Sequence, residues 1–470
     1  MGHASPQSIA IIGGGITGLT AASRLHREGH RVTVFEKSSQ VGGSIASHLQ
    51  DGWLAEVGPN SLQETPEITV LINELGLGRE RQVANPAARN RFIVRRGRLV
   101  PVPLSPPGFL TSPLFSLGAR FRVLRELLTR PRVRTTDTSL ASFVAAHFGQ
   151  EIVDYGLNPL VAGVYAGDPE KLSARYAFPN LWQLERRHGS LLRGFRAQAA
   201  ERRARGESSG LVPIISFERG LQTLPDALAA ALPPGAVRLG TQVTSLIPGR
   251  PWKIITSGGD SVQTAEFDAV LLALPAPALG QLVFGTLAER PLASLDHLPH
   301  PPVSSLFLGF RREQVKHPLD GFGALLPAAE RRSLLGVLFS STLFPGRAPA
   351  GHVALTVLVG GMRQPDAARL AAPELLASVL PDLRDLLGVT GDPVYSRHSF
   401  WPKAIPQYNV GHERFLEPLT LCENRHAGLF IGGNARDGIS LPDCVRSGLK
   451  LAGRATEYLA RMPEDLKPET

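Results

Sequence analysis

The chain has 470 residues, of which 43% are hydrophobic and 19% charged, and its formal net charge is +9. This composition is typical of a soluble globular protein with a large core, divided into two or three domains. Two cysteines, Cys422 and Cys444, exclude a disulfide framework, and residues 1–6 lack the pattern of a signal peptide, so we expect a cytoplasmic location.

The positive charge favours acidic partners, but nucleic acid is not expected among them. The sequence has no zinc-ligand spacing, no RNP-type aromatic motif and no recognition-helix pattern. No metal site is predicted, because the 13 histidines are scattered along the chain. The charge fits either a basic pocket for an acidic small molecule or a basic surface that faces a membrane.

The first predicted element is a βαβ unit with a glycine-rich turn. Apolar residues 9–12 run into the turn, and a second apolar strand over 32–35 ends at Glu36. The turn consists of Gly13, Gly14, Gly15, Ile16, Thr17 and Gly18. Such glycines permit the turn, let backbone N–H groups approach a pyrophosphate, and let helix and strand pack closely, while the acidic residue accepts from ribose hydroxyls. The pattern predicts a dinucleotide site.

A second glycine pair, Gly42 and Gly43, follows soon after Glu36. NAD enzymes do not need such a pair. Flavoproteins of the glutathione-reductase type often have one, because the longer FAD molecule needs a second close approach of backbone. The pair therefore favours FAD, and the alternative is an ordinary loop.

Residues 99–119 carry no charge but contain five prolines, which excludes a transmembrane helix. The following segment, 120–128, places its apolar residues on one helical face with arginines around it. These apolar residues are Phe121, Leu124, Leu127 and Leu128. The pattern fits a basic amphipathic helix at a membrane surface, or a helix that packs on its own domain with a solvated basic side.

The rest of the chain alternates between helical and strand patterns. It predicts helices over about 95–205, a strand over 211–215, a helix over 221–231 and strands over 236–246 and 267–275. Apolar runs bounded by Gly and Pro predict a mostly antiparallel sheet over 301–310, 321–326, 334–340 and 352–360. A short buried strand over 428–434 and a helix over 443–462 follow.

These elements predict an α/β protein, α+β overall, in three parts. The first is a Rossmann-like FAD domain of the glutathione-reductase type, assembled from segments 1–85, 206–280 and 395–470. The second is an antiparallel-sheet substrate domain over 86–95 and 281–394. The third is a helical domain over 96–205, which is the candidate for a membrane-facing part.

At several motifs the chain resembles the protoporphyrinogen oxidases, FAD enzymes of late haem synthesis, and their bacterial coproporphyrinogen-oxidising relatives. Beyond the glycine pairs, the resemblance rests on 56–60, 90–92, 159–168, 171–173, 216–220, 321–323 and 432–444. It implies that FAD oxidises a porphyrinogen to the porphyrin in three successive two-electron hydride transfers, with O₂ as the usual final acceptor. Because electron-rich pyrroles assist loss of the hydride, no catalytic base, triad or metal is expected.

The resemblance also implies partners beyond the tetrapyrrole substrate and O₂. The helical domain of this family often rests on a membrane, so a peripheral contact with the inner face of the cell membrane is expected. A homodimer and a transient contact with other enzymes of the haem pathway stay open.

The resemblance assigns cofactor contacts residue by residue. The glycine-rich turn 13–18 holds the pyrophosphate, Glu36 with Lys37 the ribose, and the backbone of Val243 the adenine. The residues expected near the flavin are Gly43, Ser44, Gly58, Pro59, Asn60, Ser61, Trp401, Gly433, Ile439, Ser440 and Leu441. The helix that begins near Asp443 directs its positive end towards the edge of the flavin where negative charge grows on reduction. Cys444 is expected to be a small core thiol and not a covalent flavin attachment.

Substrate contacts follow from the same resemblance. Arg91 is expected to bind a substrate carboxylate, and Phe322, Leu325 and Leu358 to line a flat apolar slot. Gly163 brings a backbone carbonyl to the pyrrole N–H groups, or is simply a turn. The alternatives are a surface charge for Arg91 and plain core packing for the apolar residues. The candidates for additional propionates of coproporphyrinogen III are Arg175, Arg186 and Arg187.

Three other functions stay open at this stage. An amine oxidase would need an aromatic cage near the flavin. The chain has only six tyrosines and four tryptophans from which such a cage could be built. A carotenoid desaturase would need a long apolar tunnel without an anchoring arginine. A prenyl-binding escort protein that has lost FAD would not need the intact glycines and Glu36.

Overall fold

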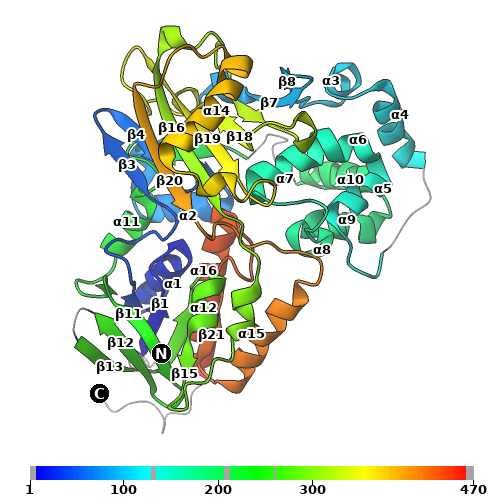
Figure 1. Cartoon of the computed structure of the whole chain (residues 1–470). Helices are drawn as coiled ribbons and strands as arrows, with labels where there is room; N and C mark the ends of the chain where they lie inside the picture. The colour runs from blue at the N-terminus through cyan, green and yellow to red at the C-terminus, as the bar shows by residue number, and fades with distance from the viewer. Residues whose placement is uncertain (1–6, 129–133, 206–211, 259–260, 462–470) are drawn as a thin grey trace.

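A computed structural model describes residues 7–128, 134–205, 212–258 and 261–461 of the chain. Figure 1 shows the N-terminal strands with the last helix at the bottom, a large sheet above them, and a group of helices from residues 106–204 to one side. The mixture of helices and several sheets confirms the predicted fold class.

A five-stranded parallel sheet forms the base of the molecule, in the order β10-β2-β1-β14-β21. Its strands are β1 (Ser8–Ile12), β2 (Arg31–Phe35), β10 (Val237–Arg238), β14 (Ala269–Leu272) and β21 (Leu429–Ile431). On one face Ile9 and Ile11 pack against α1 (Ile16–Arg27) and α16 (Leu441–Ala460). Because the other face is also covered, β1, β14 and β21 are almost entirely apolar.

The second face of the parallel sheet is covered by a smaller sheet and two helices. The small sheet contains β11 (Gln242–Ile247), β12 (Trp252–Gly258), β13 (Ser261–Phe267) and β15 (Val283–Phe284). The helices are α12 (Ala276–Gln281) and α15 (Glu413–Arg425). The single strand predicted over 236–246 is wrong, because the chain turns at Gly240, with φ +61°, and β10 and β11 join different sheets.

Short elements connect this base to the rest of the molecule. They are the hairpin β3 (Ser47–Gln50) and β4 (Trp53–Glu56), the strands β5 (Leu62–Gln63), β6 (Arg81–Val83) and β9 (Ile214–Phe217), and the helices α2 (Pro66–Glu74) and α11 (Thr223–Ala230). Two predicted end points, Leu211 and Met462, lie outside the described residues.

A seven-stranded sheet, in the order β20-β16-β19-β18-β17-β7-β8, confirms the predicted antiparallel sheet. Its strands are β7 (Asn90–Arg95), β8 (Arg98–Pro101), β16 (Val303–Arg311), β17 (Gly321–Leu325), β18 (Gly336–Leu338), β19 (His352–Gly360) and β20 (Tyr395–Trp401). The pairing of β17 with β7 is parallel, and the other pairs are antiparallel. Helix α14 (Ala372–Leu387) packs on the face that carries Leu306 and Leu308.

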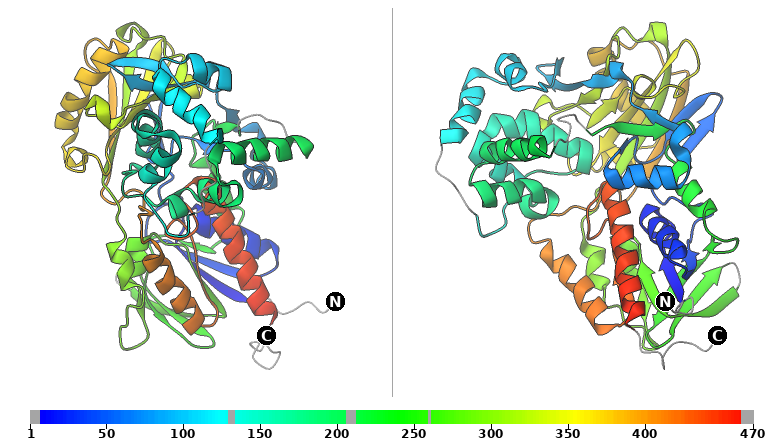
Figure 2. Two further views of the ribbon diagram at one scale, coloured as in Figure 1. Left: turned by 90° about the vertical axis from the view of Figure 1, so that its right-hand side faces the viewer. Right: turned by 180° about the vertical axis from the view of Figure 1, so that it is seen from behind.

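The helical part begins later than predicted, because Arg98–Pro101 forms β8 of the seven-stranded sheet. It contains α3 (Pro106–Thr111), α4 (Leu117–Arg125), α5 (Leu140–Phe148), α6 (Gln150–Ile152), α7 (Asn158–Tyr165), α8 (Ala174–Ala177), α9 (Pro179–His188) and α10 (Leu191–Ala204). The right-hand view of Figure 2 shows how this group extends away from both large sheets. Phe143 and Trp182 lie in its own core. No helix among the described residues has the length and apolar character needed to cross a membrane.

Most of the predicted apolar face of α4 is exposed, although Ala119 in the same helix lies in a buried cluster with Leu114 and Phe115. Phe121 is 68% exposed and Leu124 47% exposed, and Leu117 in the same helix is 77% exposed. Packing of this apolar face on its own domain is therefore not observed for Phe121 and Leu124. The division of the chain into three parts stays a prediction. It assigns β20 to the FAD domain, although β20 lies in a sheet whose other strands come from the other two parts.

Candidate functional site

The glycine-rich turn has the geometry that its sequence predicts. Gly13 has φ +109°, and its N–H donates to the carbonyl of Phe35 at 2.9 Å. A Cβ on Gly18 would lie 2.0 Å from the carbonyl oxygen of Gly13, so only glycine lets α1 approach the end of β1 this closely. The first turn of α1 is thereby fixed above the end of the parallel sheet.

Open space lies in front of the first turn of α1. Gly15 caps this helix, and a Cβ built on it would meet no atom within 4 Å. The second glycine pair closes on the first turn, since the N–H of Gly42 donates to the carbonyl of Gly14 at 2.9 Å. A Cβ on Gly43 would lie 3.5 Å from Cα of Gly15. Backbone N–H groups at a helix N-terminus, next to space that side chains leave free, fit the pyrophosphate of a dinucleotide.

Both carboxylate oxygens of Glu36, the residue expected to bind the ribose, accept hydrogen bonds from the backbone. One carboxylate oxygen accepts from the N–H of Gly14 at 2.7 Å, and the other accepts from the N–H of Ser38 at 2.8 Å. The N–H of Thr241 donates to the Glu36 carbonyl at 2.9 Å, and β11 with Val243 follows directly. The expected ribose and adenine residues are therefore neighbours. Lys37 is exposed beside them.

The residues expected near the flavin meet at the turn that follows β4. A Cβ on Gly58 would lie 2.0 Å from the carbonyl oxygen of Ser44, so glycine permits this contact. The indole N–H of Trp401 donates to the carbonyl of Val57 at 3.0 Å, and the amide of Asn60 donates to the carbonyl of Gly58 at 3.2 Å. Pro59 and Ser61 complete this turn, which we call the 58–61 turn.

The C-terminal helix reaches the same region. Helix α16 begins at Leu441 and is capped by Ser440, whose hydroxyl accepts from the N–H of Asp443 at 3.2 Å. A Cβ on Gly448 would lie 2.5 Å from the carbonyl oxygen of Thr17, so α16 crosses α1 at very short range. Burial raises the pKa of Cys444 to about 11, which keeps this group a thiol at neutral pH.

A buried aromatic pair supports the loop that precedes α16. The Tyr408 hydroxyl donates to the carbonyl of Asn434 at 2.6 Å and accepts from the N–H of Gly438 at 3.1 Å, beside Gly433 and Ile439. The ring of His412 stacks on Tyr408 with centroids 4.2 Å apart. Burial, with a smaller effect from the Arg414 charge, lowers the pKa of His412 to about 4.

The expected substrate residues lie on and beside one face of the seven-stranded sheet. Leu325 pairs with Gly336, and Gly336 pairs with Leu358, so the three residues form a row across β17, β18 and β19. Directly paired residues point to the same face of a sheet. Both leucines are only half-buried in strands that are otherwise mostly buried. The face opposite α14 therefore presents an apolar strip that the chain does not fully cover.

Gly163 and Arg91 border this strip. A Cβ on Gly163, in the last turn of α7, would lie 2.7 Å from Cδ2 of Leu325, so glycine lets α7 approach the strip. The guanidinium of Arg91 lies over the ring of Phe322, with Cζ 5.5 Å from the centroid. No ion pair involves Arg91 among the described residues, which leaves its charge available to an anion.

The candidates for additional propionates are not brought to this face. They are Arg175 on α8 and Arg186 and Arg187 on α9, all three in exposed positions. Among the described residues, no hydrogen bond, ion pair or ring contact joins any of them to β17, β18 or β19. The described residues also contain no group of three or more metal-ligating side chains.

Sequence reasoning missed two features of the site. Leu338 and Thr356 form the next row of the same sheet face, two residues along the strands from the leucine row. Alternation in the strand predicted over 334–340 could have found Leu338. The second feature is a buried ion pair between Glu56 and Arg347, with 3.1 Å between the charged atoms. Arg347 follows a Pro-Gly pair, which is typical of an exposed turn. The neighbouring sequence therefore gave no indication that Arg347 is buried.

Comparisons with known proteins place the chain among flavoproteins. Residues 16–456 match the profile of the family described as flavin containing amine oxidoreductase. Protoporphyrinogen oxidase 2 of Arabidopsis thaliana is 34% identical, over 99% of this chain and 96% of the relative. Coproporphyrinogen III oxidase of Bacillus subtilis is 28% identical, over 96% and 98%. A crystal structure from Exiguobacterium sp. 255-15, provisionally assigned as a protoporphyrinogen oxidase, is 26% identical with a TM-score of 0.81, over 98% and 100%.

Proposed function

Because this chain belongs to the protoporphyrinogen oxidase family of flavin-containing amine oxidoreductases, we propose that it oxidises a porphyrinogen to the porphyrin in haem biosynthesis. Its cofactor is FAD, as the two glycine-rich turns predicted. When bound, FAD supplies the hydride acceptor for three successive two-electron steps, and O₂ is the final electron acceptor. The residues of the chain bind and orient the two partners.

The observation that carries the proposal is the apolar strip beside an unpaired arginine. A porphyrinogen is a broad, largely apolar ring system with carboxylate side chains at its edge. The strip of Leu325, Gly336 and Leu358 suits the ring, and Arg91 suits a propionate, because a guanidinium can bind a carboxylate through two parallel hydrogen bonds.

The backbone at Gly163, next to the strip, orients the tetrapyrrole ring. Gly163 lies in the last turn of α7, where carbonyl groups have no partner within the helix. A pyrrole N–H above Leu325 can donate to such a carbonyl. A larger residue at position 163 would occupy the space of the Leu325 side chain. The electron-rich pyrroles assist loss of the hydride, so no side chain needs to act as a strong base.

The test compares Arg91→Ala and Arg91→Lys with the wild-type holoenzyme, using protoporphyrinogen IX and coproporphyrinogen III as separate substrates and porphyrin fluorescence as the readout. Loss of a charge-assisted hydrogen bond is worth about 1.5–3 kcal/mol, so Arg91→Ala should raise KM about ten- to hundredfold with FAD content unchanged. Lysine should restore part of the loss, because it keeps the charge without the paired hydrogen bonds.

Arg98→Ala, an exposed arginine on β8, is the matched control and should leave KM unchanged. An unchanged KM in Arg91→Ala would remove Arg91 from the anchor role. If the wild-type holoenzyme forms no porphyrin from either substrate, the proposed function is wrong.

The helical part supports a second element of the proposal, a peripheral contact with the inner face of the cell membrane. Leu117, Phe121 and Leu124 expose apolar surface on α4, and Arg122 and Arg125 lie in the same helix. Apolar side chains can enter the boundary between headgroups and acyl chains, while arginines attract anionic lipids. The contact involves a helix that lies on the membrane.

A further inference from the structure

A small cavity lies between the 58–61 turn and the seven-stranded sheet. It is lined on its polar side by Glu56, Asn60, Ser340, Arg347 and Thr356, and on its apolar side by residues that include Leu338. Its accessible volume is about 10 Å³, close to the space that one ordered water molecule needs. The cavity is too small for a porphyrinogen, and it lies one row of the sheet beyond the leucine strip.

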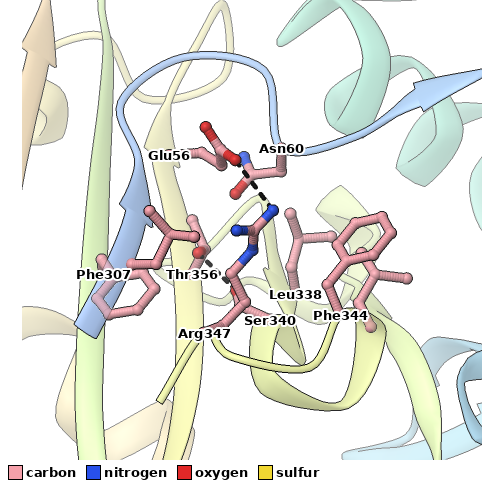
Figure 3. A pocket seen from close by; sticks show the side chains of 10 residues that line it. Glu56, Asn60, Phe307, Leu338, Ser340, Phe344, Arg347 and Thr356 are labelled. Carbon is pink, nitrogen blue, oxygen red and sulfur yellow. Dashed lines mark hydrogen bonds and ion pairs between the residues drawn. The ribbon is translucent and has the colours of Figure 1, made fainter. Parts of the chain in front are cut away.

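Arg347 is the charged group that faces this cavity. It is 2% exposed, it pairs with Glu56, and its Nη2 donates to the hydroxyl of Ser216 at 2.6 Å. Its Nη1 has no hydrogen-bond partner among the described residues. Figure 3 shows the guanidinium among the lining residues, between Glu56 and the side chains of Ser340 and Thr356. A buried guanidinium N–H without a partner costs about 1–3 kcal/mol, so the native protein is expected to satisfy it.

The other polar groups of the cavity suit a neutral ligand. The hydroxyls of Ser340 and Thr356 bond to each other at 2.8 Å, and both residues are buried. The charge of Arg347 is already balanced by Glu56, so an anion would leave the site with an unpaired negative charge. Water can accept from Nη1 and still exchange hydrogen bonds with the hydroxyls. A cavity this small with several polar partners meets the conditions for a buried water.

The ion pair also joins two parts of the fold. Glu56 ends β4, where the hydroxyl of Ser47 and the N–H of Leu221 donate to its carboxylate at 2.5 Å and 3.0 Å. Arg347 follows α13 (Ser340–Leu343), which packs against β19. The carbonyl of Arg347 accepts from the N–H of Leu54 at 3.3 Å. The pair therefore ties the strand that precedes the 58–61 turn to the seven-stranded sheet.

We propose that this cavity binds one water molecule through Arg347 Nη1, and that Arg347 and its water position the 58–61 turn against the seven-stranded sheet. Arg347 is a positioning residue, because it acts on the flavin through the turn. The water site stands on geometry alone, whereas the effect on the flavin rests on the proposed function.

Burial raises the pKa of Glu56 and lowers the pKa of Arg347, so each charge depends on the other. Removing one charge leaves the other buried without a partner, which can destabilise the protein by several kcal/mol. The experiment therefore uses Arg347→Lys, Arg347→Met and the double variant Glu56→Gln/Arg347→Met, in which both charges are removed together. Arg332→Met is the matched control, because Arg332 forms an ion pair with Asp382 away from the 58–61 turn.

The first measurement is a crystal structure of the wild-type holoenzyme at a resolution that shows ordered water. We expect one water within hydrogen-bond distance of Arg347 Nη1, and a well-ordered cavity without it would overturn the site. The second is the visible spectrum and reduction potential of bound FAD, with its dissociation constant, in each folded variant. Arg347→Met and the double variant should shift the spectrum and potential and weaken FAD binding by about tenfold, which corresponds to about 1.4 kcal/mol.

Arg347→Lys should restore part of the spectral shift, and Arg332→Met should leave the spectrum unchanged even if it lowers stability. Unchanged flavin properties in the double variant would overturn the positioning role. If neither porphyrinogen is oxidised while the water and the spectral shift are observed, the proposed function fails and the inference about Arg347 stands.

Discussion

Gly15 and Gly453 both have room for a methyl group, but only Gly15 faces the predicted cofactor. A Cβ on Gly15 or on Gly453 would meet no atom within 4 Å, and the backbone of Gly15 is one that alanine adopts. Gly15→Ala should therefore change the free energy of unfolding of the apoprotein by less than about 1 kcal/mol. Its methyl group enters the space assigned to the pyrophosphate, so the dissociation constant of FAD should rise at least about tenfold.

The control for this prediction is Gly453→Ala, on α16, which should leave FAD binding unchanged and stabilise the helix by about 0.5–1 kcal/mol. Isothermal titration of the apoprotein with FAD gives both dissociation constants. Equal affinity in Gly15→Ala and wild type would move the pyrophosphate away from this turn.

The buried ring of His412 should make the free energy of unfolding depend on pH. His412 is 2% exposed and neither ring nitrogen has a partner among the described residues. Its pKa is about 4 in the folded chain and 6.5 in the unfolded chain, so the unfolded state binds the proton first as pH falls. Stability is therefore present above pH 6.5 and is lost between pH 6.5 and pH 4, by about 3 kcal/mol from this group.

His412→Phe keeps an aromatic ring against Tyr408 and removes this titration. Chemical unfolding at pH 7 and at pH 4 should show a smaller loss of stability on acidification in this variant than in wild type. His48→Phe, at a half-buried position on β3, is the control and should match wild type. The same loss in all three proteins would contradict the assignment to His412.

At the scale of single elements, the exposed face of α4 predicts binding to lipid. Phe121→Ser/Leu124→Ser removes two apolar side chains that are 68% and 47% exposed. Each side chain is worth about 1–2 kcal/mol when it enters an apolar phase, so binding to vesicles that contain anionic lipid should weaken at least about tenfold. Leu421→Ser, on α15 and 67% exposed, should bind like wild type in the same sedimentation assay.

Turnover without vesicles should be the same in these variants, because the side chains of Phe121 and Leu124 are exposed, and α4 contacts the cluster beside Leu325 through Ala119. Equal vesicle binding of the double variant and wild type would contradict a membrane contact through α4. It would not affect the proposed reaction.

The elements differ in how far their sequences predicted them. Strands β16 and β19 are long apolar runs between turn residues, and the sequence located both. The prediction of one strand over 236–246 failed because the chain turns at Gly240, inside an otherwise strand-like segment. For α4 the periodicity identified the apolar face but not its partner, since solvent exposure depends on how the whole helical part is placed.

At the scale of the whole molecule, the candidate site is assembled from segments far apart in the chain. The glycine turns were predictable, because glycine spacing reports a local backbone conformation. Leu338 lies in the row next to that of Leu325 and Leu358 because of the order in which the strands pair. The hydrophobic pattern of a single strand does not determine this order. The contact between Glu56 and Arg347 spans 291 residues, and neither residue has a local feature that indicates a partner. Buried polar contacts between distant segments are thus the part of this site that the sequence left undetermined.

We propose that FAD in this chain accepts hydride from a porphyrinogen held on the strip of Leu325, Gly336 and Leu358. Mixing the oxidised holoenzyme with protoporphyrinogen IX or coproporphyrinogen III without oxygen, in a stopped-flow instrument, isolates this transfer from reoxidation. We expect rapid loss of the oxidised-flavin absorbance with at least one substrate, and the return of this absorbance when O₂ is admitted. Flavin that stays oxidised with both substrates, in protein with full FAD content, would contradict it.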